Sequence, residues 1–128
     1  RLACGWLIRR FLDQEGAFKF VPGPQYSPRP GEIRFDMFDG EFTHEGDRCT
    51  FEVMIQRLRL NDHALGPLAE VVHDIDLKDD KYARSETAGF NALLAGLVAS
   101  HQDDARRMEE GARLFDNLYA YFHRHKRE

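Results

Sequence analysis

The chain has 128 residues, of which 42% are hydrophobic and 31% are charged, and its formal net charge at pH 7 is −4. These values are typical of one globular domain with a single hydrophobic core, and the negative charge argues against nucleic-acid binding, which depends on neutralising phosphates. No apolar run approaches the roughly 20 residues that a membrane-spanning helix needs, and no signal peptide is recognisable. We therefore expect a single cytoplasmic domain over residues 1–128 that does not act at a membrane.

The first part of the chain is expected to combine one helix with short strands. Residues 1–12 carry an apolar face at helical spacing and predict a helix, or a strand that leads into one. Alternating and aromatic residues predict a strand over 17–21, and further short strands are expected over 33–35 and 41–43. The prolines and glycines of 22–31 predict a loop, which could be a lid or only a long connection.

Four more helices are expected after residue 47. The first carries apolar residues at helical spacing over about 51–58, and Asp47 is placed to cap its start. Ser85 is expected to cap the third. The second and third of these helices are indicated by the apolar residues Leu65, Leu68, Val72 and Ile75, and by Phe90, Leu93, Leu94, Leu97 and Val98. The last helix is expected to place Met108, Phe115, Leu118 and Phe122 inward. The predicted fold class is α+β and mainly helical, with about five helices and a small β-sheet in the N-terminal half.

A metal site is the first chemical hypothesis. Glu70 and His73 are three residues apart, which places them on neighbouring rows of one helix face. This Glu-x-x-His spacing is used by carboxylate-bridged iron and manganese sites in helical bundles. His101 and Asp104 repeat the three-residue separation near the next helix boundary. Together these residues could provide ligands from two helices.

His44 and Asp76 could complete a mixed imidazole and carboxylate set suited to Fe, Mn or Zn. His44 lies between a predicted strand and a predicted helix, where it could act as a ligand or a proton donor, or be only a hydrogen-bonded surface residue. The alternative to a metal site is a solvated helix face, because Glu70, His73 and Asp74 lie opposite the apolar stripe on a helical wheel.

The two thiols and a pair of arginines form the second hypothesis. Cys4 near a helix N-terminus would have its thiolate stabilised by the helix dipole and by Arg9 or Arg10. Arginine also binds tetrahedral oxyanions such as sulfate, phosphate or chromate in a bidentate way. Cys49 lies at a second predicted helix start, so both thiols could face one pocket as catalytic groups.

The alternative is that both cysteines are small buried hydrophobic residues, and a disulfide between them is less favoured because a cytosolic chain would keep them reduced. The arginines would then pair with Asp13, Glu15 or Asp36. A run of aspartates at 74, 76, 79 and 80 is a weak candidate for a hard cation, since it lacks the pattern of an EF-hand loop. The chain also has no glycine-rich phosphate loop and no Cys-x-x-Cys pair.

Two motifs resemble one known family. Residues 3–11 read Ala-Cys-Gly-Trp-Leu-Ile-Arg-Arg-Phe, and residues 44–51 read His-Glu-Gly-Asp-Arg-Cys-Thr-Phe. Both are similar to motifs of the C-terminal domain of the chromate resistance protein ChrB, and the resemblance extends over essentially the whole chain. Gly5 stands where the family usually has proline, and residues 70–76 depart from the text of the chromate-sensing members. The resemblance implies membership of the family rather than a chromate-sensing role.

The leading functional hypothesis is therefore a metal-binding domain, with a non-haem metal redox enzyme as its most concrete form. A transition metal (Fe, Mn or Zn) would lie near Cys4 or Cys49, and Arg9 and Arg10 would stabilise negative charge on an anionic substrate or oxyanion. The alternative is a non-catalytic chromate-sensing or sulfate-sensing accessory module that uses the two arginines. A third possibility is a helical domain that acts through protein contact, and a homodimer is possible in either case.

Overall fold

The computed structural model describes residues 2–12, 30 and 45–125, and this part of the chain contains five helices and no strand. The helices are α1 (Leu2–Phe11), α2 (Thr50–Arg57), α3 (Leu65–Leu77), α4 (Glu86–Ser100) and α5 (Asp104–Arg124). The five predicted helices are confirmed. The described part is thus all-helical rather than α+β, and the residues predicted as strands (17–21, 33–35 and 41–43) lie outside it.

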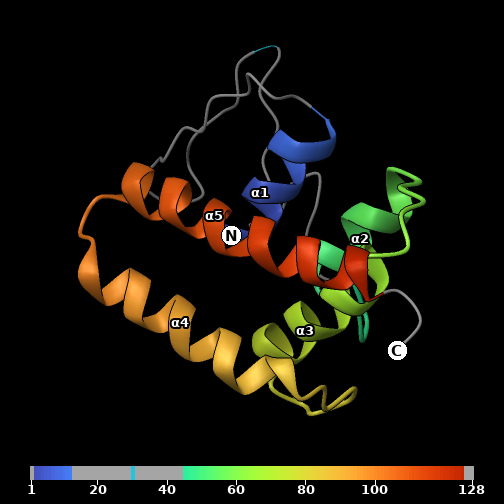
Figure 1. Ribbon diagram of the computed structural model, residues 1–128. Helices are drawn as coiled ribbons and strands as arrows, with labels where there is room; N and C mark the ends of the chain where they lie inside the picture. The colour runs from blue at the N-terminus through green and yellow to red at the C-terminus, as the bar shows by residue number, and fades with distance from the viewer. Residues whose placement is uncertain (1, 13–29, 31–44, 126–128) are drawn as a thin grey trace.

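The longest helix, α5, runs across the molecule and contacts α1, α3 and α4 (Figure 1). Its contact with α1 is the most extensive between any two described helices. Gly111 allows this close approach, because a Cβ atom there would lie only 3.2 Å from the Leu2 side chain. The inward positions predicted for α5 are confirmed, since Met108, Phe115, Leu118 and Phe122 are all buried.

A group of aromatic rings holds α1, α2 and α5 together. Trp6 of α1 stacks on Phe51 of α2 and on Phe115 of α5, with ring centroids 6.4 and 5.8 Å apart. The ring of Tyr119 packs against Trp6 from the next turn of α5, at 5.7 Å. Aromatic pairs at these separations contribute beyond the area they bury. The N-terminal helix is therefore fixed to the rest of the core.

Helix α2 begins at a cysteine. Cys49 is the N-cap, with extended backbone angles, and the Glu52 carboxylate accepts a hydrogen bond from its backbone N–H at 2.9 Å. This is the carboxylate half of a capping box. The prediction that Asp47 caps this helix is wrong, because Asp47 lies two residues before the N-cap and its carboxylate instead accepts a hydrogen bond from Lys81 at 3.0 Å.

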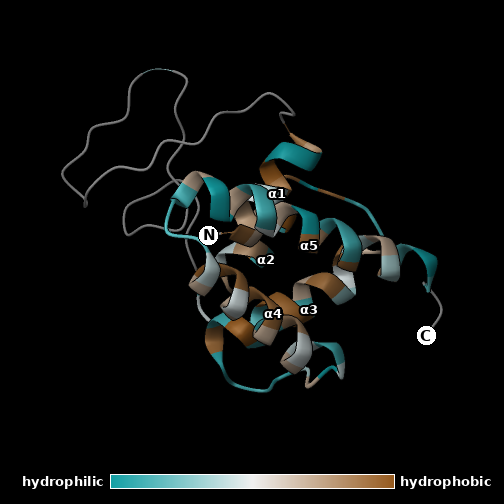
Figure 2. Ribbon diagram, turned by 60° about the vertical axis from the view of Figure 1, so that its left-hand side comes forward, coloured by the Kyte–Doolittle hydropathy of each residue, from teal (hydrophilic) through white to brown (hydrophobic). Residues whose placement is uncertain are grey.

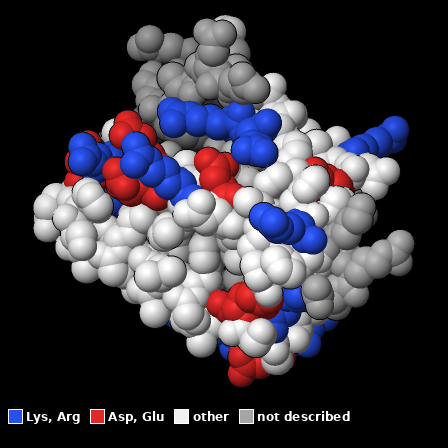
Figure 3. Space-filling view, in the orientation of Figure 1, with Lys and Arg blue, Asp and Glu red and all other residues white. Residues whose placement is uncertain are grey.

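Helix α4 is the most exposed of the five. Thr87 to Gln102 contain no Asp, Glu, Lys or Arg, and Figure 3 shows a broad uncharged area over this side of the molecule. Figure 2 correspondingly draws most of α4 in brown or white. Phe90 is buried, but Leu93 is 59% exposed and Val98 is 36% exposed, so the apolar residues that indicate this helix do not all face the core. Among the described helices, α4 makes its main contacts with α3 and α5, which leaves one apolar side exposed.

Within the described residues, none of the helices combines the length and hydrophobicity needed to cross a bilayer.

Candidate metal centre

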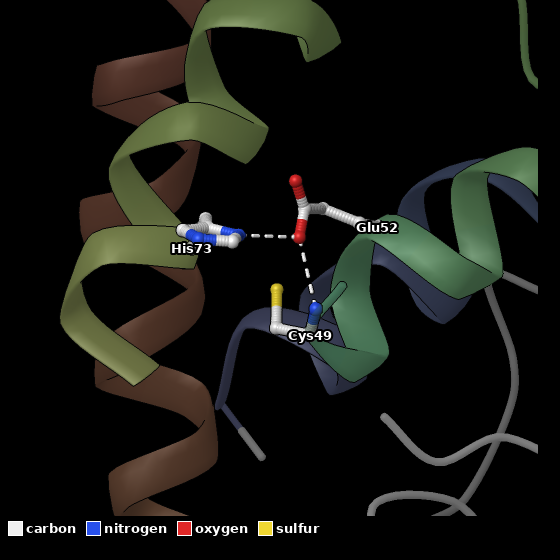
Figure 4. Close-up of side chains that lie close together, drawn as sticks. All are labelled: Cys49, Glu52 and His73. Atoms are coloured by element: carbon white, nitrogen blue, oxygen red, sulfur yellow. Dashed lines mark hydrogen bonds and ion pairs between the residues drawn. The ribbon is translucent and has the colours of Figure 1, made fainter. Parts of the chain in front are cut away.

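The first turn of α2 meets the middle of α3 through one short side-chain contact. The Oε1 atom of Glu52 lies 2.7 Å from Nδ1 of His73, and the same oxygen accepts the hydrogen bond from the Cys49 backbone (Figure 4). The His73 side chain is fully buried and that of Glu52 is 14% exposed. The capping interaction therefore also fixes the Glu52 carboxylate against the imidazole.

The thiol of Cys49 completes a group of three potential ligands. Figure 4 shows its sulfur pointing toward the Glu52–His73 pair. One ligand atom from each of Cys49, Glu52 and His73 lies within 4.8 Å of the others, and Cys49 is only 1% exposed. Sulfur, imidazole nitrogen and carboxylate oxygen are the ligands that zinc uses in proteins, and thiolate and imidazole also suit iron.

The other ring nitrogen of His73 has a partner of its own. Nε2 lies 2.9 Å from Oδ2 of Asp79, which follows the end of α3. His73, Asp74 and Asp79 form a second group of close ligand atoms. Asp74 already accepts backbone hydrogen bonds from Tyr82 and Ala83, at 3.1 and 2.7 Å. In this second group, the Asp74 carboxylate therefore already serves to hold the loop after α3.

These contacts change the acidity of the buried groups. Burial alone would lower the pKa of His73, but hydrogen bonds from its ring to Glu52 and Asp79 outweigh this and raise the pKa above its ordinary value. Burial raises the pKa of the Cys49 thiol to about 12, and the neighbouring Glu52 carboxylate contributes to the rise. Cys49 is therefore a protonated thiol at neutral pH, which works against a nucleophilic role when no metal is bound.

A cavity of about 400 Å³ lies between the C-terminal half of α2 and the start of α3, and Glu52 is part of its wall. Cys49 and His73 are not among its lining residues. The remaining lining residues are Ile55, Gln56, Leu60, Asn61, Asp62, His63, Leu65, Gly66 and Ala69. Glu52 is therefore the ligand candidate that connects the buried group with an accessible space.

Of the predicted transition-metal ligands that lie in the described part of the chain, only His73 belongs to a group of close ligand atoms. Its neighbour Cys49 is expected from the sequence as a catalytic thiol rather than as a ligand. Cys49 and His73 meet, whereas the carboxylate of Glu70 pairs with Arg84 at 3.1 Å and belongs to neither group. Asp76 is exposed on the last turn of α3 and is also outside both groups. His44 lies outside the described residues.

The second predicted pair, at the junction of α4 and α5, also stays separate from His73. His101 follows the end of α4, where its ring nitrogen bonds to the backbone oxygen of Leu97 at 3.0 Å. Asp104 begins α5 and is exposed, 3.8 Å from Arg107. Neither belongs to a group of close ligand atoms in the described part of the chain.

The helical wheel is wrong about the polar face of α3. It places His73 and Asp74 toward solvent, but they are 0% and 5% exposed. A wheel assumes one buried stripe, whereas α3 contacts α2, α4 and α5 and is covered on several sides. Burial of a polar group is costly unless it is hydrogen-bonded. Glu52 and Asp79 provide the hydrogen bonds that offset this cost for His73.

Glu52 was missed by the sequence reasoning, although a signal was present. The spacing Cys49-x-x-Glu52 is that of a capping box, with cysteine in the position usually held by serine or threonine. A capping box predicts that the glutamate folds back over the helix start. It does not predict which side chain of another helix the glutamate will meet.

The remaining predicted residues lie on α1. Cys4 is 2% exposed, and Cys4 and Cys49 are thiols rather than a disulfide pair, as expected. Arg9 is half-buried. Arg10 is exposed and its Nη1 lies 3.3 Å from the Asp116 carboxylate, with the guanidinium 4.8 Å from the Tyr119 ring centre. The partners predicted for the arginines, Asp13, Glu15 and Asp36, lie outside the described residues.

Comparison with known proteins identifies the family to which this domain belongs. Residues 1–122 match the family described as ChrB, C-terminal domain, and the chain therefore belongs to that family. The resemblance inferred from the two sequence motifs is thus confirmed.

Among curated proteins, the chain is similar to Protein ChrB of Cupriavidus metallidurans (strain ATCC 43123 / DSM 2839 / NBRC 102507 / CH34). The two sequences are 35% identical over 123 residues, which are 95% of this chain and 37% of the relative. The chain thus spans little more than a third of that relative's length. No solved structure matches it.

Proposed function

We propose that this domain binds one divalent transition metal, zinc or ferrous iron, through the Cys49 sulfur, the Glu52 carboxylate and Nδ1 of His73. The observation that carries the proposal is the convergence of these three ligand atoms within 4.8 Å in a largely buried position between α2 and α3. A thiolate in the set favours zinc or iron over manganese, which prefers oxygen ligands.

The competing interpretation is a buried ion pair without metal. A protonated His73 between Glu52 and Asp79 would satisfy both ring nitrogens. The position of Cys49 favours the metal, because a neutral thiol adds little to an ion pair whereas a thiolate is a strong ligand for zinc and iron. Metal binding would then displace protons from Cys49 and His73, as is usual for such ligands.

Three protein ligands leave a coordination position for water or a substrate, which is the arrangement of catalytic rather than structural zinc sites. A bound metal would supply Lewis acidity, or redox chemistry in the case of iron. Glu52 would connect this position to the cavity between α2 and α3. Asp62 also lines the cavity, and two acidic lining residues disfavour the binding of anions there. Metal binding is therefore better supported than redox chemistry on an oxyanion.

The test is metal loading of the purified domain. We expect the demetallated protein to bind one equivalent of Zn²⁺ or Fe²⁺, measured by competition with a chromophoric chelator and by elemental analysis, with a rise in melting temperature. Cys49→Ala, Glu52→Gln and His73→Gln should each weaken binding at least tenfold. Matched controls elsewhere in the fold are Cys4→Ala, Glu109→Gln and His125→Gln, which should bind as the parent does. A parent protein that takes up neither metal would refute the proposal.

A further inference from the structure

We propose that Asp79 is the positioning residue of this metal centre: it holds the His73 ring so that Nδ1 faces the metal while Nε2–H donates to Asp79. The inference rests on the proposed metal site and adds a residue outside its three ligands. It also assigns the tautomer of His73. Its basis is that the two ring nitrogens face different carboxylates, Glu52 at 2.7 Å and Asp79 at 2.9 Å.

The chain reversal after α3 explains why Asp79 reaches His73. Helix α3 ends at Leu77, and its C-cap residue Lys78 has the left-handed backbone angles φ 54° and ψ 38°. The backbone N–H of Lys78 donates to the Asp74 carbonyl. This reversal returns Asp79 to the face of α3 on which His73 lies. The carboxylate of Asp79 also accepts a hydrogen bond from the Lys81 backbone at 3.1 Å, so its own orientation is fixed.

Two further contacts hold the ring and the loop in place. The Tyr82 ring packs edge-on against the His73 ring, with centroids 5.1 Å apart and planes at 86°. The Asp74 carboxylate accepts backbone hydrogen bonds from Tyr82 and Ala83. Because the loop is attached to α3 at Asp74 and touches the ring through Tyr82, rotation of His73 would break several contacts at once.

A carboxylate that accepts a hydrogen bond from the second nitrogen of a ligating histidine fixes the tautomer and makes the ligand more basic. Loss of such a partner typically lowers metal affinity by about 10- to 100-fold. Asp79 is suited to this role because its side chain is 42% exposed, so it approaches the ring from the solvent side, opposite the Cys49–Glu52 group.

The experiment compares Asp79→Asn with Asp80→Asn, which removes the neighbouring exposed carboxylate of the same loop. Zinc affinity is measured by chelator competition, and the nitrogens of His73 are observed by ¹⁵N NMR before and after zinc addition. We expect Asp79→Asn to lower affinity by about 10- to 100-fold and Asp80→Asn to leave it unchanged. Asp79→Glu should restore part of the loss. In the parent protein, zinc should shift Nδ1 of His73 and leave a proton on Nε2.

The outcomes separate this inference from the proposed metal site. A parent protein that does not bind zinc would refute the site itself. Zinc binding by the parent with equal affinity in Asp79→Asn would refute only the role of Asp79. Coordination through Nε2, with binding abolished in Asp79→Asn, would make Asp79 a ligand and would also overturn the inference. The melting temperature of each variant without metal, compared with the parent, shows whether a loss of affinity merely reflects unfolding.

Discussion

The Glu52 carboxylate and the His73 imidazole join the start of α2 to the middle of α3 at 2.7 Å, although 21 residues separate them in the sequence. The same carboxylate accepts the backbone hydrogen bond that begins α2. Formation of the helix start and assembly of the ligand group thus depend on one side chain. A change at Glu52 is therefore expected to affect both stability and metal binding.

The His73–Asp79 pair predicts a pH window of stabilisation. Because the pKa of His73 is raised in the folded protein, this group stabilises the fold below its unfolded pKa of 6.5. That stabilisation is lost as pH rises through the folded pKa. The hydrogen bond from His73 lowers the pKa of Asp79, so this carboxylate stabilises the fold above its unfolded pKa of 3.8. That stabilisation is lost as pH falls through the folded pKa. Among the described residues, the ionisable groups near the His73 ring are Glu52, Asp74, Asp79, Tyr82 and Cys49.

Urea unfolding of metal-free parent and Asp79→Asn proteins, repeated from pH 3 to 9, checks this window. The difference in unfolding free energy between the parent and Asp79→Asn should be greatest between roughly pH 4 and 6.5, and it should become smaller at lower and at higher pH. Asp80→Asn serves as the control for loss of one loop charge. A difference that stays constant over the whole range would contradict the ion pair.

The hydrogen bond between Trp6 and Asp116 is expected to stabilise the α1–α5 contact. The indole Nε1 donates to Oδ1 of Asp116 at 2.8 Å, and Trp6 is 3% exposed. Asp116→Ala should lower the free energy of unfolding by about 1 kcal/mol, because a mostly buried donor loses its partner. Arg10→Gln should cost less, since both side chains of its ion pair with Asp116 are about half exposed. Chemical denaturation measures the free energy of unfolding of both variants. Equal losses in Asp116→Ala and Arg10→Gln would show that the ion pair, rather than the indole hydrogen bond, carries the stabilisation.

Phe115 should be among the most sensitive core positions. It is 1% exposed and contacts Trp6 and Phe90. Phe115→Ala should destabilise the domain by about 3–5 kcal/mol. Leu93→Ala on the exposed side of α4 should change stability by no more than about 0.5 kcal/mol. A large loss at Leu93 in the isolated chain would show that this face is covered in solution.

The oxyanion hypothesis for Arg9 and Arg10 stays a prediction. Titration calorimetry of the isolated domain with sulfate and with chromate should detect millimolar or tighter binding if an arginine pair grips the anion. That binding should disappear in Arg9→Gln or Arg10→Gln. The ion pair of Arg10 with Asp116 competes with an anion, so Asp116→Asn should strengthen binding by this route. Heat of binding that is unchanged in all three variants would remove the arginines from the function.

The helices could be predicted from the sequence because each carries its own periodic signal. The inward face of α5 followed from Phe115 and Leu118 at helical spacing, and both are buried. Local periodicity fails where a helix is covered on several sides, which is why the helical wheel places His73 on the solvent side, the alternative to its role as a metal ligand. Periodicity also says little about burial on α4, because it marks apolar residues such as Leu93 without showing whether a partner covers them.

The candidate site was only half predictable for a similar reason. Cys49 and His73 were identified as chemically notable residues, but their meeting depends on how α2 packs against α3. The Glu-x-x-His spacing suggested Glu70 as the partner of His73. In the structure, Glu70 pairs with Arg84, and the carboxylate that contacts His73 is that of Glu52 from another helix. Spacing within one helix does not fix contacts between two helices.

The most direct test of the central claim is X-ray absorption at the zinc edge of the zinc-loaded domain. The account predicts one sulfur at about 2.3 Å together with nitrogen and oxygen ligands at about 2.0–2.2 Å. The sulfur contribution should vanish in Cys49→Ala and persist in Cys4→Ala. Spectra that contain only nitrogen and oxygen ligands in the parent protein, or a sulfur contribution that survives in Cys49→Ala, would contradict it.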